Sequence, residues 1–302
     1  MASALPDIKK LITLPALACC ALAIAIAAAL SLPGMAGQAA GELAGYSAFT
    51  GLGVLGAIFA NATGAGGGVI FIPAFAQLGF TEAQAVATSF GIQCFGMTAG
   101  ALAWSSFYRS EQRPGGQWAA FLPTVALCAA ASIAGLWSVF AADIAAPAAL
   151  GPLFAAFSLF LGIAILVTVL LRQSGPLRTT LSPLDWVALP LIAYSGGIVT
   201  AWLSVGVGEF VAFYLIVRRY EVTLAVAAAV VISAISVWSA APEQLLVSQQ
   251  ANWQVVLFAG PGAVVGGLLA RHLVLKLGAR RLKLFFAFWL LIIGLVEWMP
   301  LA

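Results

Sequence analysis

Long apolar stretches separated by short polar segments occupy almost the whole chain. Seven of them are long enough to cross a bilayer as helices of about 20 residues, and they cover 11–32, 83–108, 117–141, 148–171, 221–239, 253–273 and 283–299. Two further apolar segments, 46–79 and 187–217, contain an internal break. The pattern predicts an all-α membrane protein with about seven full spans and two broken or re-entrant helical hairpins.

Glycine interrupts both broken segments. The first break, 61–68, holds four glycines, and the second, 204–209, holds two. Each glycine in a helix interior costs about 1 kcal/mol relative to alanine. An open backbone in hydrocarbon survives only where it is buried in protein or faces a water-filled cavity. Paired broken segments are the best sequence pointer to the binding site of a secondary transporter.

Composition places the chain in the membrane. Apolar residues make up 63% of it and charged residues 8%, whereas a soluble domain has about 25% charged residues. The net charge of +3 comes without a long basic stretch, so a nucleic-acid partner is not expected. The four cysteines lie inside apolar segments, where they are expected to pack, and His272 is the only histidine. We therefore expect no metal site and no cofactor.

The N-terminus allows two interpretations. Lys9 and Lys10 precede the apolar stretch 11–32, and small residues follow at 36–40. This order is typical of a signal peptide. The stretch is longer than a usual signal core and matches a bilayer span, which favours a retained first helix.

Positive residues predict the topology. Lysine and arginine gather in clusters that all fall on the cytoplasmic side if each broken segment enters and leaves on one face, or equally if it forms two short spans. A single tilted span at 46–79 would instead place Arg109 and Arg113 outside. The N-terminus is then cytoplasmic and the C-terminus periplasmic.

Two units of the same order and opposite orientation follow from this topology. We expect an N-terminal helix and periplasmic loop at 1–45, a first repeat at 46–171, a cytoplasmic linker at 172–183 and a second, inverted repeat at 184–302. An offset of 142 residues pairs Gly64 with Gly206 and Gly66 with Gly208.

The first break and the residues after it resemble a known family. The run Gly64–Gly68, then Pro73, Gly79 and the residues 85–89, is similar to the first-half signature of the TauE/SafE sulfite-exporter family of bacterial inner-membrane transporters. The resemblance extends over roughly 46–299. It implies transport of a small anion such as sulfite or sulfoacetate, commonly outward, although some relatives work in uptake.

The breaks supply the predicted substrate site. Half-helices that begin at the glycines aim free N–H groups and the positive ends of their dipoles at the membrane interior, and nearby amides and hydroxyls suit oxyanion oxygens. The predicted substrate-binding residues are Asn61, Thr63, Gly64, Gly66, Gly67, Gly68, Gln93, Trp202, Ser204, Gly206 and Gly208. The alternative is that the glycines only allow close helix packing, and Trp202 either walls the pocket or packs between the repeats.

Glu209 is the single acid in the middle of an apolar segment. A charge at that depth costs about 2.5–3.5 kcal/mol on insertion scales, so the side chain is expected to be protonated, paired or facing water. Protonation beside an anion site suggests proton coupling. The alternative is a neutral side chain that hydrogen-bonds the backbone of the second hairpin.

These features together predict a secondary transporter that exports a small organosulfur anion by alternating access. The alternatives are an uptake permease or a channel for another small organic anion. An intramembrane enzyme is a remote alternative, because His272 at a span end is the only histidine base and no serine motif accompanies it. We therefore expect no catalytic residues. The expected partners are the anion, the lipid bilayer and protons.

Overall fold

The computed structural model describes residues 36–111, 116–147, 150–170 and 176–298. The predicted first span at 11–32 lies outside these residues. The helices are α2 (Ala36–Thr63), α3 (Gly68–Gln77), α4 (Glu82–Glu111), α5 (Phe121–Ala141), α6 (Leu150–Leu170), α7 (Pro183–Leu203), α8 (Val207–Val217), α9 (Val222–Ala241), η1 (Pro242–Val247), α10 (Trp253–Leu277) and α11 (Ala279–Trp298). Within the described residues the backbone is helical apart from turns, loops and one isolated bridge between Arg178 and Tyr220.

Several helices are suited to a bilayer. Five of them are long and apolar enough to cross it, and they cover Glu82–Ser110, Phe121–Ala141, Pro183–Leu203, Val222–Val247 and Trp253–Gly278. The prediction of a helical membrane protein is confirmed. The predicted spans at 148–171 and 283–299 correspond to α6 and α11.

The first hairpin begins earlier than predicted. Helix α2 starts at Ala36 and not at residue 46, and it runs for 28 residues. The added turns contain four alanines, which favour a helix, and no proline; their three glycines, at 37, 41 and 45, do not end it.

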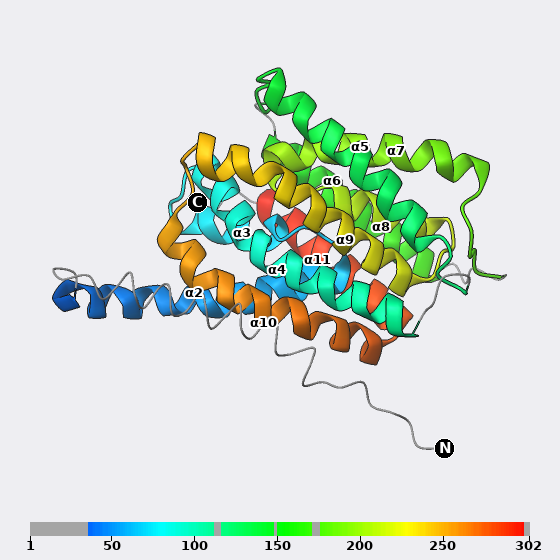
Figure 1. Cartoon of the computed structure of the whole chain (residues 1–302), viewed down its shortest axis with the longest axis horizontal. Helices are drawn as coiled ribbons and strands as arrows, with labels where there is room; N and C mark the ends of the chain where they lie inside the picture. The colour runs from blue at the N-terminus through cyan, green and yellow to red at the C-terminus, as the bar shows by residue number, and fades with distance from the viewer. Residues whose placement is uncertain (1–35, 112–115, 148–149, 171–175, 299–302) are drawn as a thin grey trace, which may run out of the picture.

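Each broken segment folds back to the end of the molecule from which it enters. Helix α3 folds back along the second half of α2, because the rings of Phe49, midway along α2, and Phe75, near the end of α3, lie 6.4 Å apart. At the start of α7, Asp185 accepts hydrogen bonds from Tyr214 Oη and Arg218 Nε, at the end of α8 and just beyond it. Figure 1 shows the α2–α3 hairpin entering from the left and the α7–α8 hairpin from the right.

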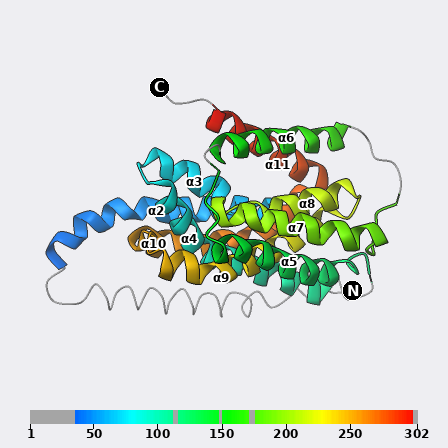
Figure 2. The ribbon, with the colours of Figure 1, turned by 90° about the horizontal axis from the view of Figure 1, so that it is seen from above.

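Close helix pairs hold the two hairpins in place. Helix α2 packs along α10 and helix α7 along α5, while α4 and α9 pack against each other in the centre. Helices α6 and α11 form a further pair, which lies along one side of the molecule in Figure 2. Glycine allows the close approaches, because Gly53 of α2 lies against the Ala259 carbonyl and Gly135 of α5 lies against the Tyr194 carbonyl.

The two halves share backbone details at positions 140 residues apart, not 142 as the sequence comparison suggested. Gly64 and Ser204, directly after α2 and α7, have φ angles of 82° and 57°. Gly79 and Arg219, after α3 and α8, have φ angles of 77° and 69°. Positive φ angles therefore recur at the start of both breaks and at both corners, whereas the positive φ of Gly206, 143°, has no counterpart at Gly66.

Candidate functional site

The two breaks touch each other in the middle of the molecule. A Cβ atom added to Gly68 would lie 2.7 Å from the carbonyl oxygens of Leu203 and Ser204. Conversely, Gly208 at the start of α8 lies directly against the carbonyl oxygen of Gly64. The ends of α2 and α7 and the beginnings of α3 and α8 therefore meet at one place, and glycine makes room for the contact.

The Glu209 carboxylate joins the two breaks. Its side chain is 1% exposed. Oε1 accepts a hydrogen bond of 3.0 Å from the Gly66 N–H in the first break. Oε2 accepts one of 2.9 Å from the Gly206 N–H in the second. Residues 66 and 206 are equivalent at the 140-residue spacing, so matching backbone donors of the two halves bind the same carboxylate.

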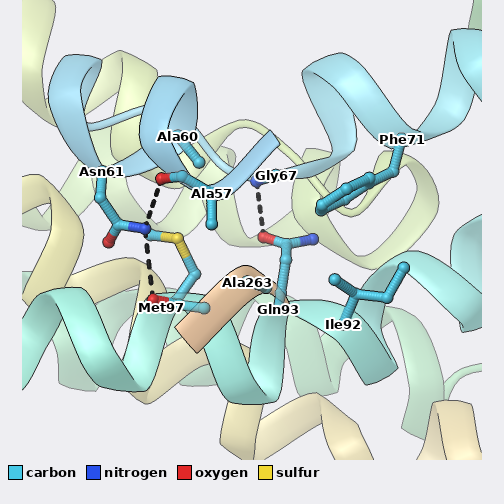
Figure 3. Close-up of a pocket in the computed structure, with 10 residues that line it drawn as sticks. Ala57, Ala60, Asn61, Gly67, Phe71, Ile92, Gln93, Met97 and Ala263 are labelled. Atoms are coloured by element: carbon cyan, nitrogen blue, oxygen red, sulfur yellow. Dashed lines mark hydrogen bonds between the residues drawn. The ribbon is translucent and has the colours of Figure 1, made fainter. Parts of the chain in front are cut away.

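Gln93 of α4 makes a second bridge between the breaks. Its Oε1 accepts a 2.8 Å hydrogen bond from the Gly67 N–H, as Figure 3 shows. Its Nε2 lies 2.6 Å from Ser204 Oγ and 3.0 Å from Ser89 Oγ. Gln93, Ser89 and Ser204 are all buried, and the structure thus brings two of the predicted site residues into one polar cluster.

Hydroxyl groups satisfy further N–H groups of the breaks. Thr63 Oγ1 accepts from the Ala65 N–H at 3.2 Å. Thr200 Oγ1 accepts from the Val207 N–H, the first of α8, at 3.1 Å. Because the first N–H groups of a helix lack partners within it, these side chains replace the missing acceptors.

Asn61 supports the first break from the end of α2. Its Nδ2 donates to the carbonyl oxygens of Ala57, at 2.8 Å, and Gly96, at 3.2 Å. Its Oδ1 is buried without a hydrogen-bond partner. The space between Asn61, Gly67, Phe71 and Gln93 has no room for a water molecule (Figure 3). The site is therefore closed in this conformation.

Trp202 faces away from the polar centre. Its indole N–H donates to the carbonyl oxygen of Ile144 at 3.1 Å, and its ring packs against an apolar cluster that includes Val69 and Val205. This placement matches the packing alternative for Trp202.

Three hydroxyl residues at the site were not among those predicted from the sequence. Ser89 and Thr200 hydrogen-bond the breaks, as described above. Ser233 of α9 is 2% exposed, and its hydroxyl has no hydrogen-bond partner within the described part of the chain. It lies beside α8, because a Cβ added to Gly208 would be 2.5 Å from Ser233 Oγ. Ser233 lies 140 residues after Gln93, and this spacing between the two halves would have predicted it as a site residue.

The comparisons with known proteins identify one family. Residues 49–296 match the family model described as Sulfite exporter TauE/SafE. The search of curated proteins and the search of solved structures returned no match.

Proposed function

Because the chain belongs to the TauE/SafE sulfite exporter family, we propose that it exports a small organosulfur anion across the bacterial inner membrane. Sulfite, sulfoacetate and similar sulfonates form the proposed substrate class. The family match and the apolar helices show a multi-pass transport protein of the membrane. We propose the substrate class, the inner membrane as the location, the outward direction of transport and the binding residues on this basis.

One observation carries it. Two backbone N–H groups, from breaks far apart in the sequence, converge on the two oxygens of one carboxylate. A sulfonate or a carboxylate substrate presents oxygens of the same kind, and backbone donors at helix beginnings favour anions. The site can therefore bind an oxyanion without an arginine or lysine, and neither occurs in α2, α3, α7 or α8.

Alternating access would use the two hairpins as moving parts. They enter from opposite ends of the molecule (Figure 1), and their backbone details recur at a spacing of 140 residues. These features support an inverted-topology repeat that rocks about a central site. The positive clusters support a cytoplasmic N-terminus and a periplasmic C-terminus, with seven full spans besides the hairpins.

The closed centre fits the occluded state through which a carrier passes. The breaks are sealed by Glu209 and Gln93, and the space beside them has no room for a water molecule. A channel in its closed state would also be sealed, so saturable exchange of the substrate decides between the two. The proposal includes coupling to protons through Glu209 and involves no enzymatic step.

A binding screen tests this proposal. Purified protein in detergent is heated with sulfite, sulfoacetate, taurine, thiosulfate or lactate, and the unfolding midpoint is recorded. A bound substrate stabilises the folded state by about 2.7 kcal/mol at one hundred times its Kd. We expect sulfite or sulfoacetate to raise the midpoint most. A midpoint that none of these compounds changes would contradict the proposed substrate class.

A further inference from the structure

We propose that the Glu209 carboxylate occupies the place of the transported anion in the empty carrier, and that the anion displaces it together with the uptake of one proton. The proton and the anion would then cross the membrane in the same direction, so the outward concentration gradient of the anion, and not the inward proton gradient, would drive export. This inference rests on the proposed function and specifies how the same site is regulated.

Occupation by the carboxylate and by a substrate is mutually exclusive. The N–H groups of Gly66 and Gly206 each donate to one oxygen of Glu209, at 3.0 and 2.9 Å. Two oxygens of a sulfonate would need the same two donors. Gly68 and Gly208 are already in contact with carbonyl groups of the opposite break, so a substrate cannot bind beside the carboxylate without moving it.

Ser233 points independently to a ligand. Its hydroxyl has no hydrogen-bond partner among the described residues, although it is 2% exposed and lies against Gly208 in the first turn of α8. A buried polar group without a hydrogen bond is destabilising. A carboxylate has two oxygens, and both are occupied by Gly66 and Gly206. A sulfonate or sulfite has a third oxygen, which the Ser233 hydroxyl could bind.

The displaced carboxylate requires a proton because none of the described elements around it supplies a positive group. Helix α8 packs against α6, α7 and α9, the break between α2 and α3 binds Glu209, and α4 contacts both breaks through Gln93. Away from the helix ends, the other ionisable side chains of these described elements are Glu42 and Tyr46 of α2, Cys94 of α4, Tyr194 of α7 and Tyr214 of α8. None of them is a cation, and the described side chains among them do not hydrogen-bond Glu209. An ionised carboxylate without its two donors would be buried and unpaired, which is strongly unfavourable.

The exchange of partners balances in charge. One proton forms an O–H bond with a carboxylate oxygen of Glu209, and the two N–H groups transfer their hydrogen bonds to the anion. When the anion leaves, the carboxyl group of Glu209 releases the proton and again accepts hydrogen bonds from the N–H groups of Gly66 and Gly206. A singly charged sulfonate therefore moves with one proton and no net charge. Binding of proton and anion is reciprocal, so each raises the affinity for the other.

Calorimetry of sulfoacetate binding tests this coupling. At about pH 7.5 both acid groups of sulfoacetate are ionised, so any proton taken up must go to the protein. Titrations in buffers of different ionisation enthalpy give the number of protons bound per anion. We expect one proton per anion for the wild type, and a Kd that rises about tenfold per pH unit at alkaline pH.

Variants separate the coupling from the binding itself. Glu209→Gln should bind sulfoacetate without proton uptake and without pH dependence, whereas the control Glu243→Gln, in η1, should behave as the wild type. Wild-type binding with no proton uptake, or with proton release, would overturn the inference and leave the proposed function standing. If neither the wild type nor Glu209→Gln binds sulfoacetate or sulfite at any pH, the proposed substrate class fails and the inference fails with it.

Discussion

Glu209 makes two hydrogen bonds that differ in origin. The bond to the Gly206 N–H spans three residues and is the usual capping arrangement of a helix beginning. The bond to the Gly66 N–H spans 143 residues and joins the two breaks. The local bond explains how an acid is tolerated in the first turn of an apolar helix. Through the distant bond, the position of the Glu209 side chain is linked to the position of the other hairpin.

A pair of serine substitutions on α9 tests the role of the hydroxyl beside that turn. Ser233→Ala removes a group that has no partner in the empty protein, so stability should stay the same or rise by about 1 kcal/mol. Its affinity for sulfoacetate should fall about tenfold, because a hydrogen bond to a charged group contributes about 1.5–3 kcal/mol. Isothermal titration and thermal unfolding measure the two effects.

Ser236→Ala is the matched control. The Ser236 hydroxyl lies 2.6 Å from Ser132 Oγ and donates to the Ile232 carbonyl, so its loss should lower stability and leave the affinity unchanged. If both variants lower only stability, Ser233 is a structural residue and has no part in anion binding.

At this scale the sequence predicted some contacts and missed others. The spacing between Gly206 and Glu209 is local, so the break and its acid could be recognised together. The contact between Glu209 and Gly66 depends on the fold, and no local pattern contains it. Trp202 shows the opposite case, because its position before the break fits both a pocket wall and a packing residue, and only the fold shows that its indole donates to the Ile144 carbonyl.

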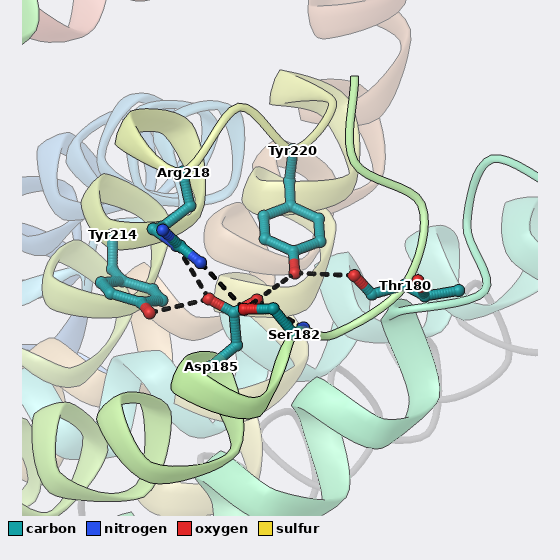
Figure 4. A network of polar contacts seen from close by, with 6 residues as sticks. All are labelled: Thr180, Ser182, Asp185, Tyr214, Arg218 and Tyr220. Atoms are coloured by element: carbon teal, nitrogen blue, oxygen red, sulfur yellow. Dashed lines mark hydrogen bonds and ion pairs between the residues drawn. The ribbon is translucent and has the colours of Figure 1, made fainter. Parts of the chain in front are cut away.

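The two hairpins are closed at their outer ends by different chemistry. At the α3–α4 corner the rings of Phe49, Phe75 and Phe80 pack together. At the α8–α9 corner a polar network surrounds Asp185, which is fully buried (Figure 4). Its carboxylate accepts hydrogen bonds from Ser182, Tyr214, Arg218 and Tyr220. Burial and the nearby Asp185 carboxylate raise the pKa of Tyr220 above its usual range, so this phenol keeps its proton in alkaline solution.

Replacing the carboxylate should loosen the second corner. In Asp185→Asn an NH2 group replaces one carboxylate oxygen, so a donor meets the donors that this oxygen had accepted from. The Arg218 guanidinium also loses its ion pair. Breaking a buried ion pair costs about 3–5 kcal/mol. We expect the lower part of this range, because the Arg218 side chain is 23% exposed. Thermal unfolding in detergent should show a clear drop of the midpoint.

Asp143→Asn is the control for this change. Asp143 is exposed and has a φ angle of 47°, which asparagine adopts readily. Equal midpoints for the two variants would mean that the network does not stabilise the corner.

Element bounds followed the sequence where turns and breaks were marked by glycine or proline. The end of α2 at Thr63 and the start of α8 at Val207 lie within the predicted breaks. The start of α2 was predicted ten residues too late, because the glycines at 37, 41 and 45 weaken the helical pattern there and the helix continues through them. The ionic corner was also missed, since Asp185 and Arg218 lie 33 residues apart in the sequence and meet only when the hairpin folds back.

The whole molecule combines a closed centre with two hairpins that enter from opposite ends. The family match covers residues 49–296, which include both hairpins. An empty carrier with an ionised Glu209 can keep both breaks together, because its carboxylate accepts hydrogen bonds from the Gly66 and Gly206 N–H groups. In Glu209→Gln the amide has one acceptor oxygen for two N–H groups. This variant should therefore pass readily between its two faces only when an anion is bound.

Transport of sulfoacetate into proteoliposomes tests this account most directly. The wild type should show saturable exchange at equal pH, accelerated by unlabelled sulfoacetate inside, and net flux that follows a pH gradient in the direction of the proton. Glu209→Gln should keep the exchange and lose the gradient-driven flux. Flux that rises linearly with concentration and is not accelerated by internal sulfoacetate would contradict a carrier. Gradient-driven flux of Glu209→Gln equal to that of the wild type would contradict coupling through Glu209.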